Sequence, residues 1–157
     1  MKILRTCGNL MKLLLVLLFL LMAYASGAGR AMAQTTAPVL DLNGEAPGID
    51  FNAVFTEDEG YKAIVSATGL TVAYEGELTA ANVVLTNSLD GDLESLTANP
   101  GETGLIVTYA ADKSTLTIKG KGPVASYQQV LRTLTYNNLS QSPDITDRVV
   151  TVTVSDG

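Results

Sequence analysis

The sequence contains no histidine and no tryptophan, and its one cysteine is Cys7. Without histidine, and without cysteine in the body of the chain, a serine triad, a cysteine protease, a zinc hydrolase and thiol redox chemistry are excluded or strongly disfavoured. Without tryptophan, a carbohydrate-binding face lacks its largest aromatic platform. Disulfides cannot hold the body of this chain together, so its fold depends on an apolar core, bound ions or neighbouring domains.

A signal peptide is the strongest functional feature of the sequence. Basic residues precede an apolar run over residues 13–25, and the small-residue sequence that ends at Ala33 fits a signal-peptidase site. The run is shorter than the roughly 20 residues that a helix needs to cross a bilayer. A permanent anchor and a cut after Ala25 are the alternatives. We therefore expect a signal peptide at 1–33, a single module at 34–157, export to the cell surface or medium, and membrane contact only through an uncleaved signal segment.

The expected mature chain is strongly acidic. Its six basic residues stand against all sixteen acids, which gives a net charge of −10, compared with −6 for the full sequence. Such a surface repels nucleic acid and anionic membranes and attracts divalent cations. The length is typical of one domain with one core, and we find no internal repeat.

Short apolar stretches separated by turn residues at intervals of about ten predict an all-β, antiparallel sandwich. The clearest strand lies near the end of the sequence, where Val150, Val152 and Val154 alternate with threonines, as in a strand with one buried face. The expected strands are 39–42, 51–55, 63–65, 82–85, 93–97, 105–109, 115–119 and 148–155.

One segment, residues 126–138, has a helical period. Its apolar residues recur at i, i+3, i+4 and i+7, namely Tyr127, Val130, Leu131 and Leu134. We expect one short helix near 127–132, with Ser126 as N-cap and Gln129 completing a capping box, which leads into a strand through Thr135 and Tyr136. The alternative is that the whole segment is a strand. The glycine-rich stretch 119–123 is expected to break the strand before it.

Five sequence pieces occur in a fixed order: APVLDLNG, DFNAVFTE, VVLTN with LDG, YQQVLRTLTYNN and DRVVTVTVSDG. Together they resemble the cadherin-like tandem modules of large bacterial surface and adhesion proteins, which are related in layout to chondroitin sulfate proteoglycan repeats. The resemblance implies an Ig/cadherin-like sandwich, repeated along a calcium-stiffened rod, with a non-enzymatic role in adhesion. The implied partners are neighbouring modules of the same chain and an unidentified ligand on a cell surface or in the matrix.

The resemblance also implies calcium ligands at junctions between modules. Glu57 matches the family's glutamate near the first strand, and Asp156 matches the aspartate after the last strand. Asp41 and Asp50 are further candidates. A complete site with a dissociation constant of about 0.1 to 1 mM would add only roughly 0.4 to 1.4 kcal/mol of stability at about 1 mM calcium, so a calcium-free module of this kind can still fold.

The sequence departs from the family where further calcium ligands are expected. Acids normally follow the third strand, and this chain instead has Ser66, Thr68, Tyr74 and Gly76. Calcium prefers about six to eight oxygen ligands, so losing up to four would weaken a site severely. Glu75 and Glu77 compensate in part.

Other functional patterns are weaker. Asp90 and Asp92 form a pair of carboxylates, as in glycosidases, but they flank a turn glycine, where solvated acids are common. The acid run 57–59 suits a charged, solubilising loop as well as a metal ligand. A carbohydrate-binding face could use the tyrosines Tyr61, Tyr74, Tyr109, Tyr127 and Tyr136. The alternative functions are therefore a secreted carbohydrate-binding module and an accessory domain of a secreted hydrolase.

Overall fold

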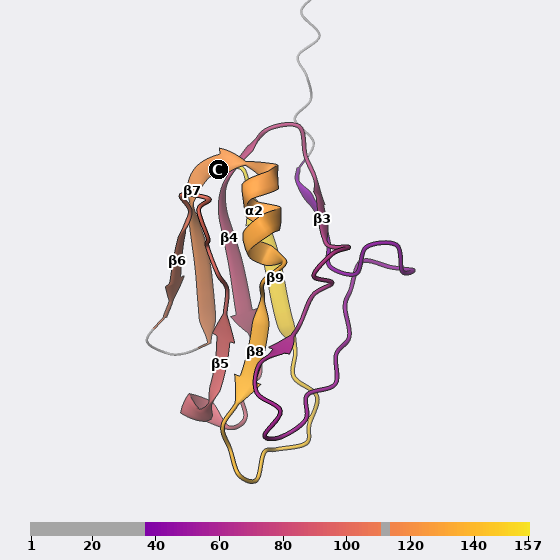
Figure 1. Ribbon diagram of the computed structural model, residues 1–157, viewed down its shortest axis with the longest axis vertical. Coiled ribbons are helices and arrows are strands. Elements are labelled where there is room, and N and C mark those ends of the chain that lie inside the picture. The colour runs from indigo at the N-terminus through magenta and orange to yellow at the C-terminus, as the bar shows by residue number, and fades with distance from the viewer. Residues whose placement is uncertain (1–36, 111–113) are drawn as a thin grey trace, which may run out of the picture. The chain divides into compact units, whose positions relative to one another are not determined.

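Two antiparallel sheets enclose one apolar core, with a short helix at one end of it (Figure 1). This computed structural model describes residues 37–110 and 114–157. The predicted signal peptide, residues 1–33, lies outside the described residues. Within those residues, no helix is both long and apolar enough to span a membrane. The predicted all-β class with one helix is confirmed.

The larger sheet has four strands in the order β6-β7-β4-β9. These are β6 (Ile106–Tyr109), β7 (Thr115–Pro123), β4 (Glu77–Leu85) and β9 (Val150–Ser155), and all neighbours run antiparallel. β4 lies between two long partners, and the alternation of side chains puts Ala81, Val83 and Leu85 into the core. A register shift between Leu78 and Ala80 explains why Leu78 is buried out of step with them.

The smaller sheet has the order β2-β8-β5. It consists of β2 (Lys62–Ala63), β8 (Thr135–Asn138) and β5 (Glu94–Thr97). β1 (Val39–Asp41) pairs with β3 (Thr71–Ala73) in a separate two-stranded sheet. The sequence pattern predicted β1 but not β3. Core residues come from both main sheets and from the helix, so the core lies between these layers.

The helix α2 (Val124–Leu131) confirms the helical period; it contains three of the four predicted apolar residues, and the fourth, Leu134, follows it, and all four are fully buried. The expectation of a strand over the whole segment is wrong. The expected cap is also wrong, because the helix begins two residues before Ser126, after Pro123 in an extended conformation and with no side-chain cap. Proline presets the turn into a helix by its fixed φ. The Oε1 atom of Gln128 accepts the Val72 N–H at 2.7 Å and ties the helix to β3.

Two other expectations are wrong. Residues 51–55 form no ladder with any strand, although Phe51 and Phe55 are half-buried. Residues 119–123 do not break the strand, because β7 runs on to Pro123 opposite the register shift in β4. Gly120, with φ of 130°, accommodates that shift, and proline is tolerated at the end of the strand. A single 3₁₀ turn, η1 (Gly91–Leu93), precedes β5.

A close approach of two backbones joins the β1 turn to the loop before β3. Gly44 has φ of 75°, and a Cβ built on it would lie 2.7 Å from the Cα of Gly69. We expect Gly44→Ala to lower the free energy of unfolding by about 2 kcal/mol or more, through strain and the clash together. Gly48→Ala is the matched control, because its φ is 86° but a Cβ there would meet nothing within 4 Å. Chemical denaturation measures both, and equal losses would show that the close approach does not matter.

Candidate functional site

A cluster of charged and polar side chains lies between β5, β8 and the start of β9. Its members, called the Glu94 cluster here, are Ser88, Asp90, Glu94, Tyr136, Asn138 and Arg148. Glu94 is completely buried, and it accepts hydrogen bonds from the hydroxyls of Ser88 and Tyr136, each at 2.6 Å, and from the Arg148 Nε–H. Arg148 therefore supplies the positive charge that a buried carboxylate needs.

The second carboxylate of the cluster is Asp90. The Arg148 Nη2–H and the Asn138 amide donate to its Oδ2 at 2.6 and 2.7 Å. The backbone N–H of Asp144 donates to the same carboxylate at 3.1 Å. The Nε–H and Nη2–H groups of Arg148 are thus occupied by acids from the segment before β5 and from the start of β5.

Burial and hydrogen bonds within the Glu94 cluster shift the pKa values of Glu94 and Tyr136. Burial alone would raise the pKa of Glu94, but the hydrogen bonds that its oxygens accept outweigh burial and lower the pKa below its ordinary value. Burial and the neighbouring Glu94 raise the pKa of Tyr136 well above its ordinary value. Tyr136 therefore stays a neutral donor and Glu94 stays an acceptor over the ordinary range of pH.

The cluster holds the loop over residues 139–149, which crosses from the smaller sheet to the larger one. Within this loop, the Thr146 carbonyl accepts from the Arg148 Nη1–H at 2.5 Å. Asn87 supports the same loop from the turn after β4, because its amide donates to the Asp147 carbonyl and its Oδ1 accepts the Val149 N–H. The loop is fixed by charged and amide groups rather than by apolar packing.

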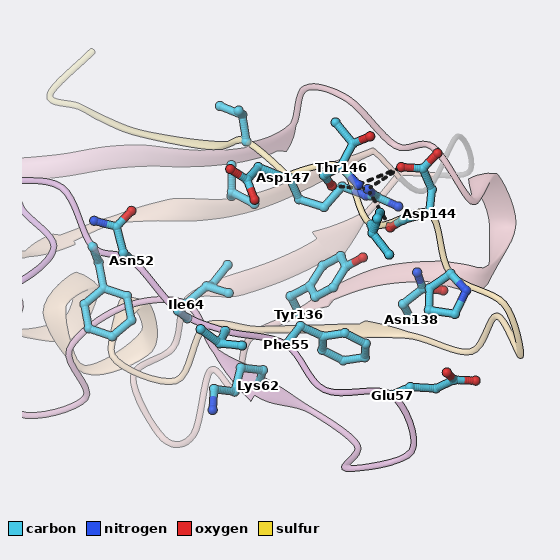
Figure 2. A pocket seen from close by; sticks show the side chains of 18 of the residues that line it. Asn52, Phe55, Glu57, Lys62, Ile64, Tyr136, Asn138, Asp144, Thr146 and Asp147 are labelled. Atoms are coloured by element: carbon cyan, nitrogen blue, oxygen red, sulfur yellow. Dashed lines mark hydrogen bonds and ion pairs between the residues drawn. The ribbon is translucent and has the colours of Figure 1, made fainter.

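A groove of about 650 Å³ lies beside the cluster, between residues 51–57 and residues 143–150, and is called the distal groove here (Figure 2). The rings of Phe55 and Tyr136 meet edge to face in its lining, with centroids 5.2 Å apart. Three acids, Glu57, Asp144 and Asp147, and two bases, Lys62 and Arg148, also line it. Its volume is within the range of about 300 to 1,000 Å³ typical of ligand sites.

The four predicted calcium ligands do not come together. Asp41 uses one oxygen to accept the N–H groups of Asn43 and Gly44, both at 2.9 Å, so it shapes a turn. Asp156 accepts a hydrogen bond from the Tyr74 hydroxyl at 2.7 Å, which is the main cause that raises the pKa of Tyr74. Asp50 is exposed in the loop after β1.

Glu57 and Asp156 lie at opposite ends of β9. Glu57 lines the distal groove together with Val150, the first residue of the strand, whereas Asp156 follows its last residue. A strand rises about 3.3 Å per residue, so the two acids are separated by roughly 20 Å. Among the described residues, no group of three or more acidic, histidine or cysteine side chains is placed to hold a metal ion.

The other candidates are mostly engaged in the fold. Ser66, where the family pattern leads us to expect an acid, accepts the Gly69 N–H at 2.9 Å and closes a turn. Asp90 of the proposed carboxylate pair is bound within the cluster. The tyrosines do not gather on one exposed face: Tyr127 and Tyr136 are buried, and Tyr61 is 62% exposed. They offer no flat platform for a sugar.

Sequence reasoning missed the pair of Glu94 and Arg148. One signal was present, because Glu94 has the same phase as Leu96 in β5 and so had to point into the core. A charged residue at an apolar position predicts a buried partner of opposite charge. Nothing in the sequence identified Arg148, 54 residues away, as that partner. No family model, no curated protein and no solved structure matches the chain.

Removing the guanidinium should leave two acids without their cation. We expect Arg148→Met to lower the free energy of unfolding by about 3 to 5 kcal/mol. Arg132→Met is the matched control, because Arg132 donates only to the neutral Leu70 carbonyl, at 2.7 and 3.0 Å, and its loss should cost about 1 to 3 kcal/mol. Urea denaturation at neutral pH measures both. Equal losses would mean that the buried charge pair has no special importance.

Glu94 also predicts how stability depends on pH. Because its pKa is lower in the folded protein, its contribution is fully present above the unfolded value of about 4.3 and is lost as the pH falls through the folded value. We expect the free energy of unfolding to fall on acidification below about pH 4, with a smaller slope in Glu94→Gln. Tyr136→Phe removes one bond to the carboxylate and should give an intermediate slope. Parallel curves from denaturation at pH 3, 4, 5 and 7 would contradict this.

Proposed function

We propose that the chain is a non-enzymatic, exported module of the cadherin-like type that acts in adhesion at a cell surface or in a matrix. The proposal rests on how the module would be presented to a partner. Both ends of the described fold leave from the same end of the sandwich, whereas residues 143–149, which line the distal groove, lie toward the opposite end (Figure 1).

Two contacts define the end from which the chain enters and leaves. Val39 pairs with Ala73, and the next residue, Tyr74, donates its hydroxyl to Asp156. Residues that adjoin the first described strand and the last one are therefore neighbours. A polypeptide attached before β1 or after β9 would hold the module by this end and leave the distal groove facing away from the attachment.

Because the two ends adjoin, an array of such modules would have a different geometry from a straight rod. A straight rod needs each module to receive the chain at one end and release it at the other. A module whose two ends adjoin would project sideways from the array instead. Such a projection suits many weak contacts that add through high local concentration, which is the mechanism proposed for adhesion here.

In this proposal, calcium binds only where the module contacts another polypeptide. Glu57 is exposed beside the distal groove, and Asp156 is exposed at the end of attachment. Because the described residues group no three acidic side chains that could hold a metal ion, each acid would draw further ligands from a neighbouring module or from the adhesion partner. The acid-rich surface raises the local concentration of cations at both places.

The proposal predicts that adhesion depends on the orientation of the module. Beads carrying residues 34–157 through a tag after Gly157 should adhere to cells of the source organism several-fold better than beads attached through Glu59→Cys. The second attachment blocks the loop next to the distal groove. Adhesion under flow is counted in about 1 mM calcium and in chelator, and we expect chelation to reduce it.

A second readout separates loss of contact from loss of fold. The melting temperature of the same protein, followed by circular dichroism, should change little between the two buffers, because each acid would draw further ligands from another polypeptide. Equal adhesion in both orientations would contradict the proposed presentation. A rise of several degrees in calcium that is lost in Glu57→Ala would contradict the proposed sharing of ligands between polypeptides.

A further inference from the structure

One edge of the larger sheet is open along β9. β9 pairs with β4 on one side, and among the described residues no strand forms a ladder with its other side. β1 comes near β9 but belongs to a different sheet. No charged residue and no proline lies within Val150–Ser155 to protect this edge.

The direction of each backbone group in β9 follows from two hydrogen bonds. The Thr86 N–H donates to the Val149 carbonyl at 2.9 Å, and the Val149 N–H donates to the Asn87 side chain at 2.7 Å, so Val149 faces β4. Directions alternate along a strand, and Thr151, Thr153 and Ser155 therefore also face β4. The N–H and C=O groups of Val150, Val152 and Val154 point to the open side.

The apolar core is also less closed on this side. Leu85, Val83 and Ala81 of β4 are 2%, 0% and 0% exposed. Their partners across the ladder, Val150, Val152 and Val154, pack on the core but stay partly exposed. On the other flank of β4, Leu116 and Ile118 of β7 are 1% and 0% exposed. The core thus lacks a covering neighbour along β9.

The distal groove continues this open edge. Val149 and Val150 line one side of it, and the unpaired segment 51–55 lines another. Three aliphatic side chains here are largely exposed, namely Val54 at 77%, Ile145 at 98% and Val149 at 54%. Apolar exposure gathered beside free backbone groups is typical of an interaction site.

These features define the chemistry of an occupant. It must offer backbone N–H and C=O groups at every second residue and apolar side chains between them, which is what an extended polypeptide strand provides. The lining has three acids against two bases, and one of the bases, Arg148, is already paired with Asp90 and Glu94, so the groove favours basic residues at the flanks of such a strand. A second copy of this chain fits less well, because it would bring its own acids to the same place.

We propose that β9 is a docking edge for one extended strand of a separate protein, with alternating apolar residues and basic flanks. The bound segment would extend the four-stranded sheet and cover the three valines. This inference goes beyond the adhesive role and does not depend on calcium. It identifies the kind of partner that the module captures.

Synthetic peptides test the proposal directly. The probe is KVTVTVTVK with blocked ends, and the controls are EVTVTVTVE and a form of the probe that is N-methylated along one edge. We expect the lysine peptide to bind at least tenfold more tightly than the glutamate peptide, and the methylated form not to bind. Hydrogen exchange should show new protection at the amides of Val150, Val152 and Val154. Equal binding of the methylated peptide would overturn the proposal.

Two proline variants locate the edge. Val152→Pro removes an N–H that points to the open side, and it should weaken binding at least tenfold. Val107→Pro is the matched control. The Ala110 N–H to Thr115 carbonyl bond shows that the N–H of Val107 points away from β7, on the opposite edge of the same sheet. Unchanged binding in Val152→Pro, or equal loss in both variants, would overturn the proposal.

The free protein provides the last readout. If Val152→Pro does not fold, the methylated peptide decides the question without any change to the protein. Size-exclusion chromatography with light scattering should show a monomer. A dimer in which the three valine amides are already protected would mean that a second copy occupies the edge, and this would also overturn the proposal.

Discussion

The buried ion pair between Arg148 and Glu94 is the interaction on which the end of the sandwich beside the distal groove depends. It joins β5 to the start of β9 across 54 residues of sequence, and Asp90 extends it to the loop over residues 139–149. Apolar contacts could not hold this loop, because its side chains, such as Ile145, are largely exposed. A charged pair costs desolvation, but it has directions that fix one arrangement of the chain. The distal groove exists because this arrangement holds one of its walls.

The core of the sandwich is covered along β7 and only partly covered along β9, and the proposed docking edge follows from this difference. On the side of β7 the core is covered, whereas on the side of β9 three core-facing valines stay partly exposed and their backbone groups point to the open side. The two ends of the described fold adjoin at Tyr74 and Asp156, far from the groove. A module held at one end, with an open edge that runs from that end to the groove, would be suited to capturing an extended partner. The acids around the groove would select partners by charge.

Local pattern predicted the parts of the fold that need only local information. The alternation in β9 and the helical period of Tyr127, Val130 and Leu131 are both confirmed, since each pattern depends on one buried face. Prediction from the sequence failed where the pairing between strands decides the local structure. Residues 51–55 have the alternation of a strand but find no ladder, and the glycines near Gly120 are absorbed by a register shift in the facing strand. Neither outcome can be deduced from the segment itself.

The sequence by itself determined the chemistry available to this protein. Without histidine and with one early cysteine, it excludes the commonest catalytic groups, and its acids favour cations and basic partners. Only the tertiary structure decided which acids are free to act. Glu94 and Asp90 are consumed by Arg148, Asp41 shapes a turn, and Glu57 and Asp156 lie at opposite ends of β9. The physical reason is that a carboxylate's role depends on what lies within about 3 Å of it, and chain topology brings those neighbours from distant positions in the sequence.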